Sequence, residues 1–458
     1  MKIDHSLKPT DLKASLSKFW EISGSKIGMI ESEYDASQGS PVFTVGGKYT
    51  TRGWTEWTQG FQYGAALLQF EATGEEQFLQ IGRHGTVDKM APHLTHMGVH
   101  DHGFNNVSTY GNLLRLMEEG FLEKDLWQAE FYKLALKASG AVQAARWTTT
   151  KNGGGFIYSF NGPHSLFVDT IRSVRILFLS HFLGHSLKGE NDVTINLFER
   201  GIQHICSTLD YNIYLGKGRD KYDVPGRTAH ECIFNTNDGN FRAPNAQQGF
   251  SGFTTWTRGL AWAICGLAEE LEFLKKVEDH HFEGIIPKET LLDKMIEGAK
   301  ATCDFYIQNS ALDGIPYWDT GAPLLYKLGD YTAKNADPFN PYEPVDSTAA
   351  AIAAQGFFRL GNVLSDEKYT QAALTITQTL LSEPYLSESP DHQGLLLHSI
   401  YHEPNGWDYV PVGQNIASGE SSMWGDYHVR ELAIQMGREI DEKPTYAYFN
   451  CLPNFRNQ

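Results

Sequence analysis

The sequence predicts an all-α protein, an (α/α)6 barrel of six helical hairpins that forms a single domain over residues 1–458. A polar or aromatic opening, followed by small and apolar residues at helical spacing, recurs six times along the chain. Each of these runs precedes a more charged helical stretch, and long loops rich in glycine, proline and asparagine separate the pairs. Paired helices that close into a ring bury the apolar face of every repeat, which favours the barrel.

The first 45 residues are expected to lead into the barrel. Leu12, Leu16 and Phe19 recur at the spacing of one helical face, which favours a helix there. A connection rich in serine and glycine follows. We therefore expect an N-terminal lead-in segment over 1–45.

The inner helices are expected directly after the six openings. The openings lie at Trp57, His100–Asp101, Val168–Asp169, Trp256, Val345–Asp346 and Trp424. The apolar runs follow at 65–68, 113–116, 174–179, 260–264, 349–354 and 429–434. Small residues in these runs allow close packing around an axis, whereas charged stretches such as 269–276 suit an outer ring. The insert at 204–255 and the stretches near 310–345 and 383–420 are expected to be long loops at one rim.

Composition narrows the class of partner. The formal net charge of -17 argues against nucleic acid and anionic membranes. Ten tryptophans and 21 tyrosines provide faces that stack on ring-shaped ligands, although core packing accounts for most of them. Five scattered cysteines without C-x-x-C spacing, no apolar run of about 18 residues and no apolar stretch near the N-terminus favour a soluble, cytoplasmic protein.

The openings predict a shared pocket. Inner helices that start at the same end of a barrel direct their first residues into one cavity. The residues expected there are Asp101, Asp169, Asp346, Trp57, Trp256, Arg258 and Trp424. The plain alternative for each aspartate is a helix cap, which contributes about 1 kcal/mol.

Two carboxylates in an aromatic pocket are typical of acid/base catalysis on a sugar. One can be kept protonated by an apolar setting while the other stays ionised. Arg258 offers a planar fork for a carboxylate or hydroxyl, and His100, His102 and His230 offer hydrogen bonds.

A metal site is the competing interpretation of the histidines. His96, His100 and His102, and separately His398 and His402, have spacings that suit zinc, but neither set completes a known signature. Gly98 and Gly103 also speak against one continuous helix. We expect no metal and no cofactor.

Several motifs occur in a characteristic order. They are Trp57-Thr-Gln-Gly-Phe, His100-Asp-His-Gly-Phe, Phe167-Val-Asp-Thr, the block from Gln248 to Trp262, Ile315-Pro-Tyr-Trp-Asp, Asp346-Ser-Thr-Ala and Trp424-Gly-Asp-Tyr. Together they resemble the unsaturated glucuronyl hydrolases, glycoside hydrolase family 88, from about residue 50 to 430. The resemblance implies the (α/α)6 barrel and an enzyme that removes a 4,5-unsaturated uronic acid from the non-reducing end of lyase-generated oligosaccharides. The reaction implied is hydration of the C4=C5 vinyl ether.

The resemblance also implies residue roles. Asp169 corresponds to the general acid/base and Asp101 to a second essential acid. Substrate-binding positions correspond to His100, His230, Gln248, Arg258 and Trp262, with Trp57 and Trp147 stacking on the sugar. The chain departs from the family pattern at His102, at 251–253 and at Gln59, and its 404–422 loop lacks the lysine or arginine that would favour sulfate.

Other functions remain open at this point. One is an unsaturated rhamnogalacturonyl hydrolase or another uronidase on the same barrel, and a more distant one is an (α/α)6 sugar epimerase that uses histidine pairs. A non-catalytic sugar-binding barrel is disfavoured because both Asp101 and Asp169 are present. The expected partner is the oligosaccharide substrate, bound by a monomer or homodimer.

Overall fold

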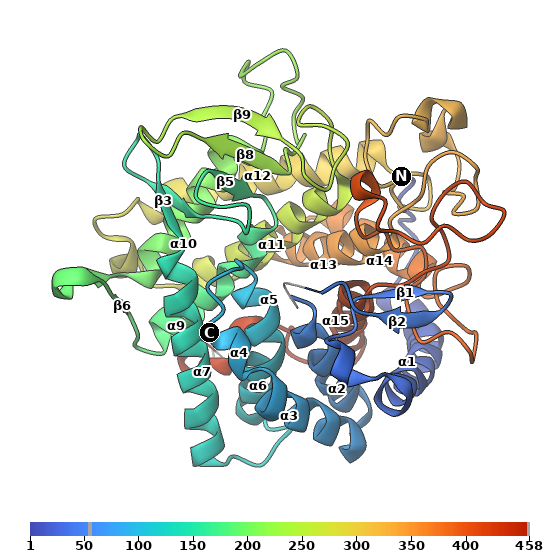
Figure 1. Cartoon of the computed structure of the whole chain (residues 1–458), viewed down its shortest axis with the longest axis horizontal. Helices are drawn as coiled ribbons and strands as arrows, with labels where there is room; N and C mark the ends of the chain where they lie inside the picture. The colour runs from blue at the N-terminus through green and yellow to red at the C-terminus, as the bar shows by residue number, and fades with distance from the viewer. Residues whose placement is uncertain (54–56, 456–458) are drawn as a thin grey trace.

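The computed structural model describes residues 1–53 and 57–455, and its helices form two concentric rings (Figure 1). The inner ring consists of α2 (Gln59–Thr73), α5 (His102–Asn106) with η3 (Val107–Gly111) and α6 (Asn112–Glu118), α8 (Thr170–Ser173) with α9 (Arg175–Phe182), α11 (Thr257–Lys276), α13 (Ser347–Leu364) and α15 (Met423–Ile440). Consecutive members pack side by side, and α15 packs against α2 to close the ring. The predicted (α/α)6 barrel is confirmed.

The outer ring covers the inner one. It consists of α1 (Lys13–Glu33), α3 (Glu76–Lys89), α7 (Leu126–Ala145), α10 (Leu197–Ser207), α12 (Lys288–Asn309) and α14 (Glu367–Leu380), and the short α4 (Ala91–Leu94) follows α3. The lead-in segment contains α1, which packs against α2 and α15 as an outer helix. The organisation as one domain with a lead-in segment stays a prediction.

Short strands and helical turns lie at the rim of the barrel. The antiparallel pairs are β1 (Phe43–Val45) with β2 (Lys48–Thr50), β3 (Trp147–Thr149) with β4 (Gly155–Ile157), and β6 (Leu187–Lys188) with β7 (Thr194–Ile195). A three-stranded antiparallel sheet runs in the order β5 (Ser165–Phe167), β8 (Glu231–Phe234), β9 (Phe241–Asn245). Part of the insert expected as a loop at 204–255 therefore forms β8 and β9. Short helical turns are η1 (Pro9–Leu12), η2 (Ala36–Gln38), η4 (Glu190–Asp192), η5 (Thr208–Asn212), η6 (Asp279–Phe282), η7 (Leu325–Leu328), η8 (Tyr331–Ala333), η9 (Glu403–Asn405), η10 (Tyr448–Cys451) and η11 (Pro453–Phe455).

Small residues set the spacing of the inner helices. A Cβ added at Gly356 on α13 would lie 2.7 Å from the backbone N and Cα of Cys265 on α11. A larger residue at this position would force the two helices apart, so the small residues in the inner runs allow the close approach that the sequence predicts.

A buried ionic network fills the barrel axis below the pocket. Arg172 Nη2 lies 2.7 Å from Glu431 Oε2, and its Nε lies 3.3 Å from Glu269 Oε2, with all three side chains excluded from solvent. The network meets the pocket floor where the rings of His428 and Trp262 pack 4.9 Å apart. Within residues 1–53 and 57–455, no helix combines the length and the apolar character needed to cross a membrane.

Candidate active site

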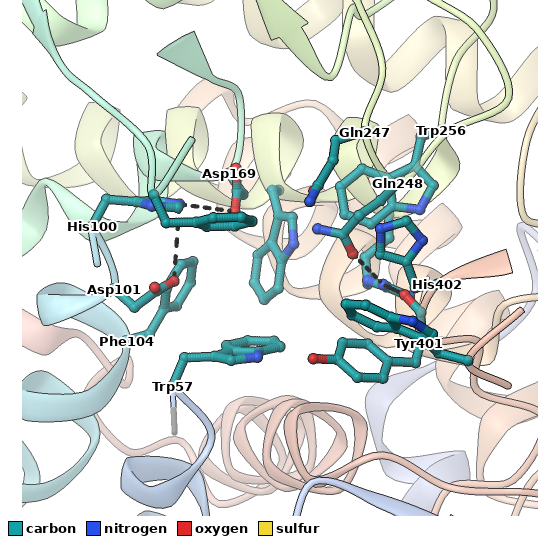
Figure 2. Close-up of a pocket in the computed structure, with 14 residues that line it drawn as sticks. Trp57, His100, Asp101, Phe104, Asp169, Gln247, Gln248, Trp256, Tyr401 and His402 are labelled. Atoms are coloured by element: carbon teal, nitrogen blue, oxygen red, sulfur yellow. Dashed lines mark hydrogen bonds and ion pairs between the residues drawn. The ribbon is translucent and has the colours of Figure 1, made fainter. Parts of the chain in front are cut away.

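A pocket at the predicted site opens at the barrel end where the inner helices begin (Figure 2). His100, Asp101 and Asp169 form one wall. Gln248, Tyr401 and His402 form the opposite wall, and Trp57 lies between the two. The openings of separate inner helices therefore meet in one cavity, although two of the residues predicted there, Asp346 and Trp424, do not line it.

The three predicted aspartates have two different structural roles: one caps a helix and the other two do not. Asp346 accepts hydrogen bonds from the backbone N–H groups of Thr348 (3.1 Å) and Ala349 (3.4 Å), so it caps α13. Asp101 and Asp169 stand at the same position before α5 and α8, but among the described residues neither side chain accepts a capping hydrogen bond. Both line the pocket and are only 7% and 8% exposed. The capping interpretation therefore accounts for Asp346, while the carboxylates of Asp101 and Asp169 are available for chemistry.

His100 joins the two pocket carboxylates. Its Nε2 lies 3.4 Å from Asp169 Oδ2 and 3.9 Å from Asp101 Oδ1, as the dashed lines in Figure 2 show. The His100 carbonyl accepts hydrogen bonds from Ser173 Oγ (2.6 Å) and Gln143 Nε2 (2.9 Å). These bonds hold the segment before α5 against α8 and α7, so the spacing of the two acids is fixed by the scaffold.

The close packing of α5 on α8 requires a glycine. Gly103 donates its N–H to Ser173 Oγ at 3.0 Å. A Cβ at Gly103 would lie 2.0 Å from the Ser173 carbonyl oxygen, a distance that no side chain can occupy. The Gly103 in the His100-Asp-His-Gly motif thus lets the two aspartate-bearing helix ends meet.

Electrostatics separate the protonation states of the three groups. Burial raises the pKa of Asp101, and the nearby Asp169 charge adds to this rise while His100 opposes it. Burial also works to raise the pKa of Asp169, but the hydrogen bond and charge of His100 outweigh it and hold this pKa below its usual value. Burial works to lower the pKa of His100, yet the two carboxylates outweigh burial and raise it. The site therefore favours an ionised Asp169 beside a protonated His100, with Asp101 as the more readily protonated acid.

Arg258 holds the opposite wall together. Its Nη1 donates to Asp346 Oδ2 (2.8 Å) and to the Ile400 carbonyl, and its Nη2 donates to Gln248 Oε1 (3.1 Å) and the Tyr401 carbonyl (2.7 Å). The sequence predicts that the planar fork of Arg258 binds a carboxylate or a hydroxyl, and Arg258 does line the pocket. The structure instead commits both terminal nitrogens to protein acceptors, so this side chain orients Gln248 and the 400–401 backbone.

His230 supports the pocket from behind. Its Nδ1 accepts hydrogen bonds from the backbone N–H groups of Gln247 (3.1 Å) and Gln248 (3.2 Å). Its ring packs 4.3 Å from that of Phe167 and 4.6 Å from that of Trp256. Burial lowers the pKa of His230 to about 4, consistent with a neutral acceptor.

The predicted tryptophans separate into pocket and non-pocket residues. Trp57, Trp256 and Trp262 line the pocket. Trp424 is buried and stacks beneath Trp57, with ring centroids 5.0 Å apart. Trp147 lies on β3, outside the pocket lining, with the Arg200 guanidinium 4.4 Å from its ring centroid. Its predicted contact with the sugar therefore has no counterpart in this pocket.

Several lining residues were not among the sequence-derived candidates. They are Phe104, Phe160, Gln247, Tyr401, His402 and Trp407. The Tyr401–Trp407 stretch reaches the pocket because Asp408 accepts the backbone N–H groups of Tyr401 (2.5 Å) and His402 (2.8 Å). Its aromatic residues, within a loop rich in glycine, proline and asparagine, were the signal that could have identified it.

Buried polar atoms around the pocket indicate a polar ligand. Within the described part of the chain, those without a hydrogen-bond partner include His100 Nδ1, Asp169 Oδ1, His230 Nε2, Gln247 Oε1 and His402 Nδ1. Buried polar groups in proteins are normally satisfied, so a cluster of unsatisfied ones at a pocket is a feature of ligand sites. A hydroxyl-rich ligand suits this set of atoms.

The histidine spacings noted in the sequence do not converge. His102 turns toward α7, where Nδ1 lies 3.0 Å from Ser139 Oγ and Nε2 lies 3.0 Å from the His96 carbonyl oxygen. His398 Nδ1 accepts the backbone N–H of Gly419 at 3.0 Å. In the region that the structure describes, the group able to offer three metal ligands is His100, Asp101 and Asp169, whose ligand atoms lie within 4.8 Å of one another.

The comparisons with known proteins agree with the motifs. No family model matches the chain. The chain is 25% identical over 379 residues to an unsaturated glucuronyl hydrolase of Formosa agariphila, covering 82% of this chain and 78% of the relative. It is 24% identical over 412 residues to an unsaturated glucuronyl hydrolase of Bacillus sp. strain GL1, covering 86% and 89%.

A solved structure described as an unsaturated glucuronyl hydrolase specific for heparin has the same fold. It superposes with a TM-score of 0.69 at 20% identity, covering 94% of this chain and 98% of that one. The resemblance to the unsaturated glucuronyl hydrolases is thereby confirmed over most of the chain.

Proposed function

We propose, from its kinship with the unsaturated glucuronyl hydrolases, that this chain removes a 4,5-unsaturated uronic acid from the non-reducing end of lyase-generated oligosaccharides. At the coarser level, the chain is a glycosidase of this group. The observation that carries the finer proposal is the pair of buried, non-capping carboxylates, Asp101 and Asp169, joined by His100 in an aromatic pocket.

The proposed reaction begins with proton transfer to carbon. Asp169, in its acid form, protonates C4 of the vinyl ether, and positive charge develops at C5 and the ring oxygen. Asp169 then takes a proton from a water that attacks C5. The resulting hemiketal opens and releases the remaining sugar. The net change is addition of one water, so no oxidant or reductant is required.

Asp169 must gain a proton before it can act as the acid. The pKa values of the neighbouring groups are shifted toward proton retention: the two carboxylates outweigh burial and raise the pKa of His100, and burial raises that of Asp101. Binding of an anionic uronate beside Asp169 would displace water and bring like charge, and both changes raise the pKa of a carboxyl group. Transfer of the Nε2 proton of His100 to Asp169 Oδ2, across 3.4 Å, then produces the acid.

The other pocket residues position the ring. Trp57 and Trp262 provide apolar faces, and Gln248, oriented by Arg258, offers amide hydrogen bonds to hydroxyl groups. We assign Asp101 to the ring hydroxyls, because it lies on the same wall as Asp169 and is similarly buried. His230 acts indirectly in this proposal, through the backbone of Gln247 and Gln248.

The test is loss of ultraviolet absorbance from the C=C bond when the protein is incubated with lyase-made unsaturated disaccharides. A set with glucuronyl units and a set with galacturonyl-rhamnose units separate the proposal from the rhamnogalacturonyl alternative. Absence of any loss on every uronate would reject the proposal. Because His100, Asp101 and Asp169 also have the geometry of metal ligands, the assay is repeated after exhaustive chelation; unchanged rates are expected from a carboxylate mechanism.

A further inference from the structure

An apolar stripe runs along the exposed face of the outer helix α7. Trp127, Phe131 and Leu134 lie at positions i, i+4 and i+7 and are 88%, 43% and 65% exposed, and Leu126 beside them is 74% exposed. The opposite face of α7 packs into the barrel through residues such as Tyr132, Leu136 and Ser139. Helix α7 therefore has apolar residues on two faces: the face that packs into the barrel and the face exposed to solvent.

The size of the stripe exceeds that of scattered surface residues. A whole aromatic side chain has about 150–250 Å² of surface, so at the exposed fractions given above the stripe, with Leu126, exposes on the order of 500 Å² of apolar surface. An apolar patch of this size is comparable to the largest one on a typical monomer, and such patches are often functional. A stable two-fold interface buries about 800 Å² per partner, with an apolar centre and a polar rim, so this stripe matches the centre of one.

The stripe is self-complementary in an antiparallel arrangement. Glu130 and Lys133 flank it on one side, and within one chain they pair at 2.9 Å. When two copies of the helix pack antiparallel about a two-fold axis, a given flank of one helix lies next to the same flank of the other helix. A two-fold axis beside Phe131 then places Glu130 of each copy opposite Lys133 of the other, so the charges match on both sides of the axis.

We propose that α7 forms an isologous homodimer interface, in which the stripe of Trp127, Phe131 and Leu134 packs antiparallel against the same stripe of a second copy. Two-fold interfaces use one patch on both partners, which a single amphipathic helix supplies. An anionic membrane is a poorer occupant because the chain carries a net charge of -17.

The interface leaves the pocket open. Helix α7 begins after α6, at the barrel end away from the pocket, and Figure 1 shows the helix at the lower left edge of the molecule. Trp127 belongs to the first turn of α7, whereas Asp101 precedes α5 at the other end of the barrel. Dimerisation and hydrolysis are therefore separable.

Sedimentation velocity on the full chain tests the proposal. The wild-type protein is expected to sediment with twice the 51.3 kDa chain mass at micromolar concentration. Trp127→Glu and Leu134→Glu are each expected to weaken dimerisation at least about 30-fold, the effect of an interface hot spot. Tyr326→Glu, at an aromatic residue on η7 that is 71% exposed, is the matched control and is expected to remain dimeric.

A charge swap tests the antiparallel register. Glu130→Lys is expected to weaken the dimer, and adding Lys133→Glu is expected to restore it, because the cross-axis pairs re-form with reversed signs. Thermal melts and the hydrolysis rate of each variant verify folding, and both should match the wild type. A monomeric wild type, including one that floats with neutral lipid vesicles, or a dimer insensitive to Trp127→Glu would overturn the proposal.

Discussion

Asp169 Oδ2 and His100 Nε2 lie 3.4 Å apart although 69 positions separate the two residues along the chain. The contact joins the segment before α5 to the start of α8, and it shifts the pKa of both groups. His100 holds the pKa of Asp169 below its ordinary value, while Asp169 and Asp101 hold that of His100 above its own. The proposed chemistry depends on this pair.

Replacing Asp169 with Asn is expected to lower kcat by about 10²- to 10⁴-fold, the contribution of a positioned general acid/base. Asn keeps the shape of the side chain but cannot transfer the proton. Binding should persist, so quenching of tryptophan fluorescence by an unsaturated disaccharide should give a dissociation constant close to that of the wild type. A variant with near-normal kcat would show that the proton comes from another group.

Replacing His100 with Asn is expected to raise the pKa of Asp169, because the hydrogen bond and positive charge that lower it are lost. In the pH dependence of kcat/KM, the side of the curve that reflects the pKa of Asp169 should move to higher pH. The exposed His84, changed to Asn on α3, is the control and should leave the profile unchanged. A curve that stays in place in His100→Asn would contradict the assignment.

Replacing Asp346 with Asn is expected to destabilise the protein by about 3–5 kcal/mol, because it leaves the buried charge of Arg258 without its ion partner. Asn still caps α13, so Asp346→Ala should cost about 1 kcal/mol more. Asp366 caps α14 by accepting the Lys368 N–H at 3.1 Å, and Asp366→Asn is the matched control. Urea unfolding measures all three variants, and equal losses at the two caps would refute the role of the ion pair.

Replacing Gly103 with Ala is expected to cost about 1–3 kcal/mol through overpacking against Ser173 and to reduce kcat by separating Asp101 from Asp169. Gly28 on α1 has no atom within 4 Å of an added Cβ, so Gly28→Ala should instead stabilise by up to about 1 kcal/mol. Thermal melts and steady-state rates distinguish the two glycines. Wild-type stability in Gly103→Ala would mean that α5 and α8 can part without cost.

Acid is expected to destabilise the fold partly through His102. Burial lowers the pKa of His102 to about 4 in the native state, whereas the unfolded value is about 6.5. Between these values the unfolded chain binds the extra proton, so stability falls as pH decreases, by about 1.4 kcal/mol per pH unit at full effect. His102→Asn should reduce the slope of unfolding free energy against pH by about one proton in this window. An unchanged slope of unfolding free energy against pH would mean that a group other than His102 takes up the proton on unfolding.

The fold was predictable because its cause is repetitive and local. Small residues such as those at 349–354 recur at helical spacing, and only a ring of paired helices buries every copy of the pattern. The position of α1 was harder to predict from the sequence. Its packing between α2 and α15 depends on closure of the ring, which brings the two ends of the chain together.

The site was predictable in part. His100, Asp101, Asp169 and Gln248 reach the pocket because they stand at or near the openings of inner helices that share a direction. Trp147 does not, because its strand carries it to Arg200 instead. Tyr401, His402 and Trp407 come from a loop whose path depends on contacts with Asp408 and Arg258, distant from any helical pattern.

The sequence by itself determined the barrel and the two acids, because helical periodicity and helix openings are properties of short stretches of chain. Only the tertiary structure decided which aspartates cap and which remain available. A cap at Asp346 and an uncapped carboxylate at Asp169 look alike in the sequence. The difference arises from side-chain orientation and from partners such as Arg258 and His100, which folding brings from distant positions.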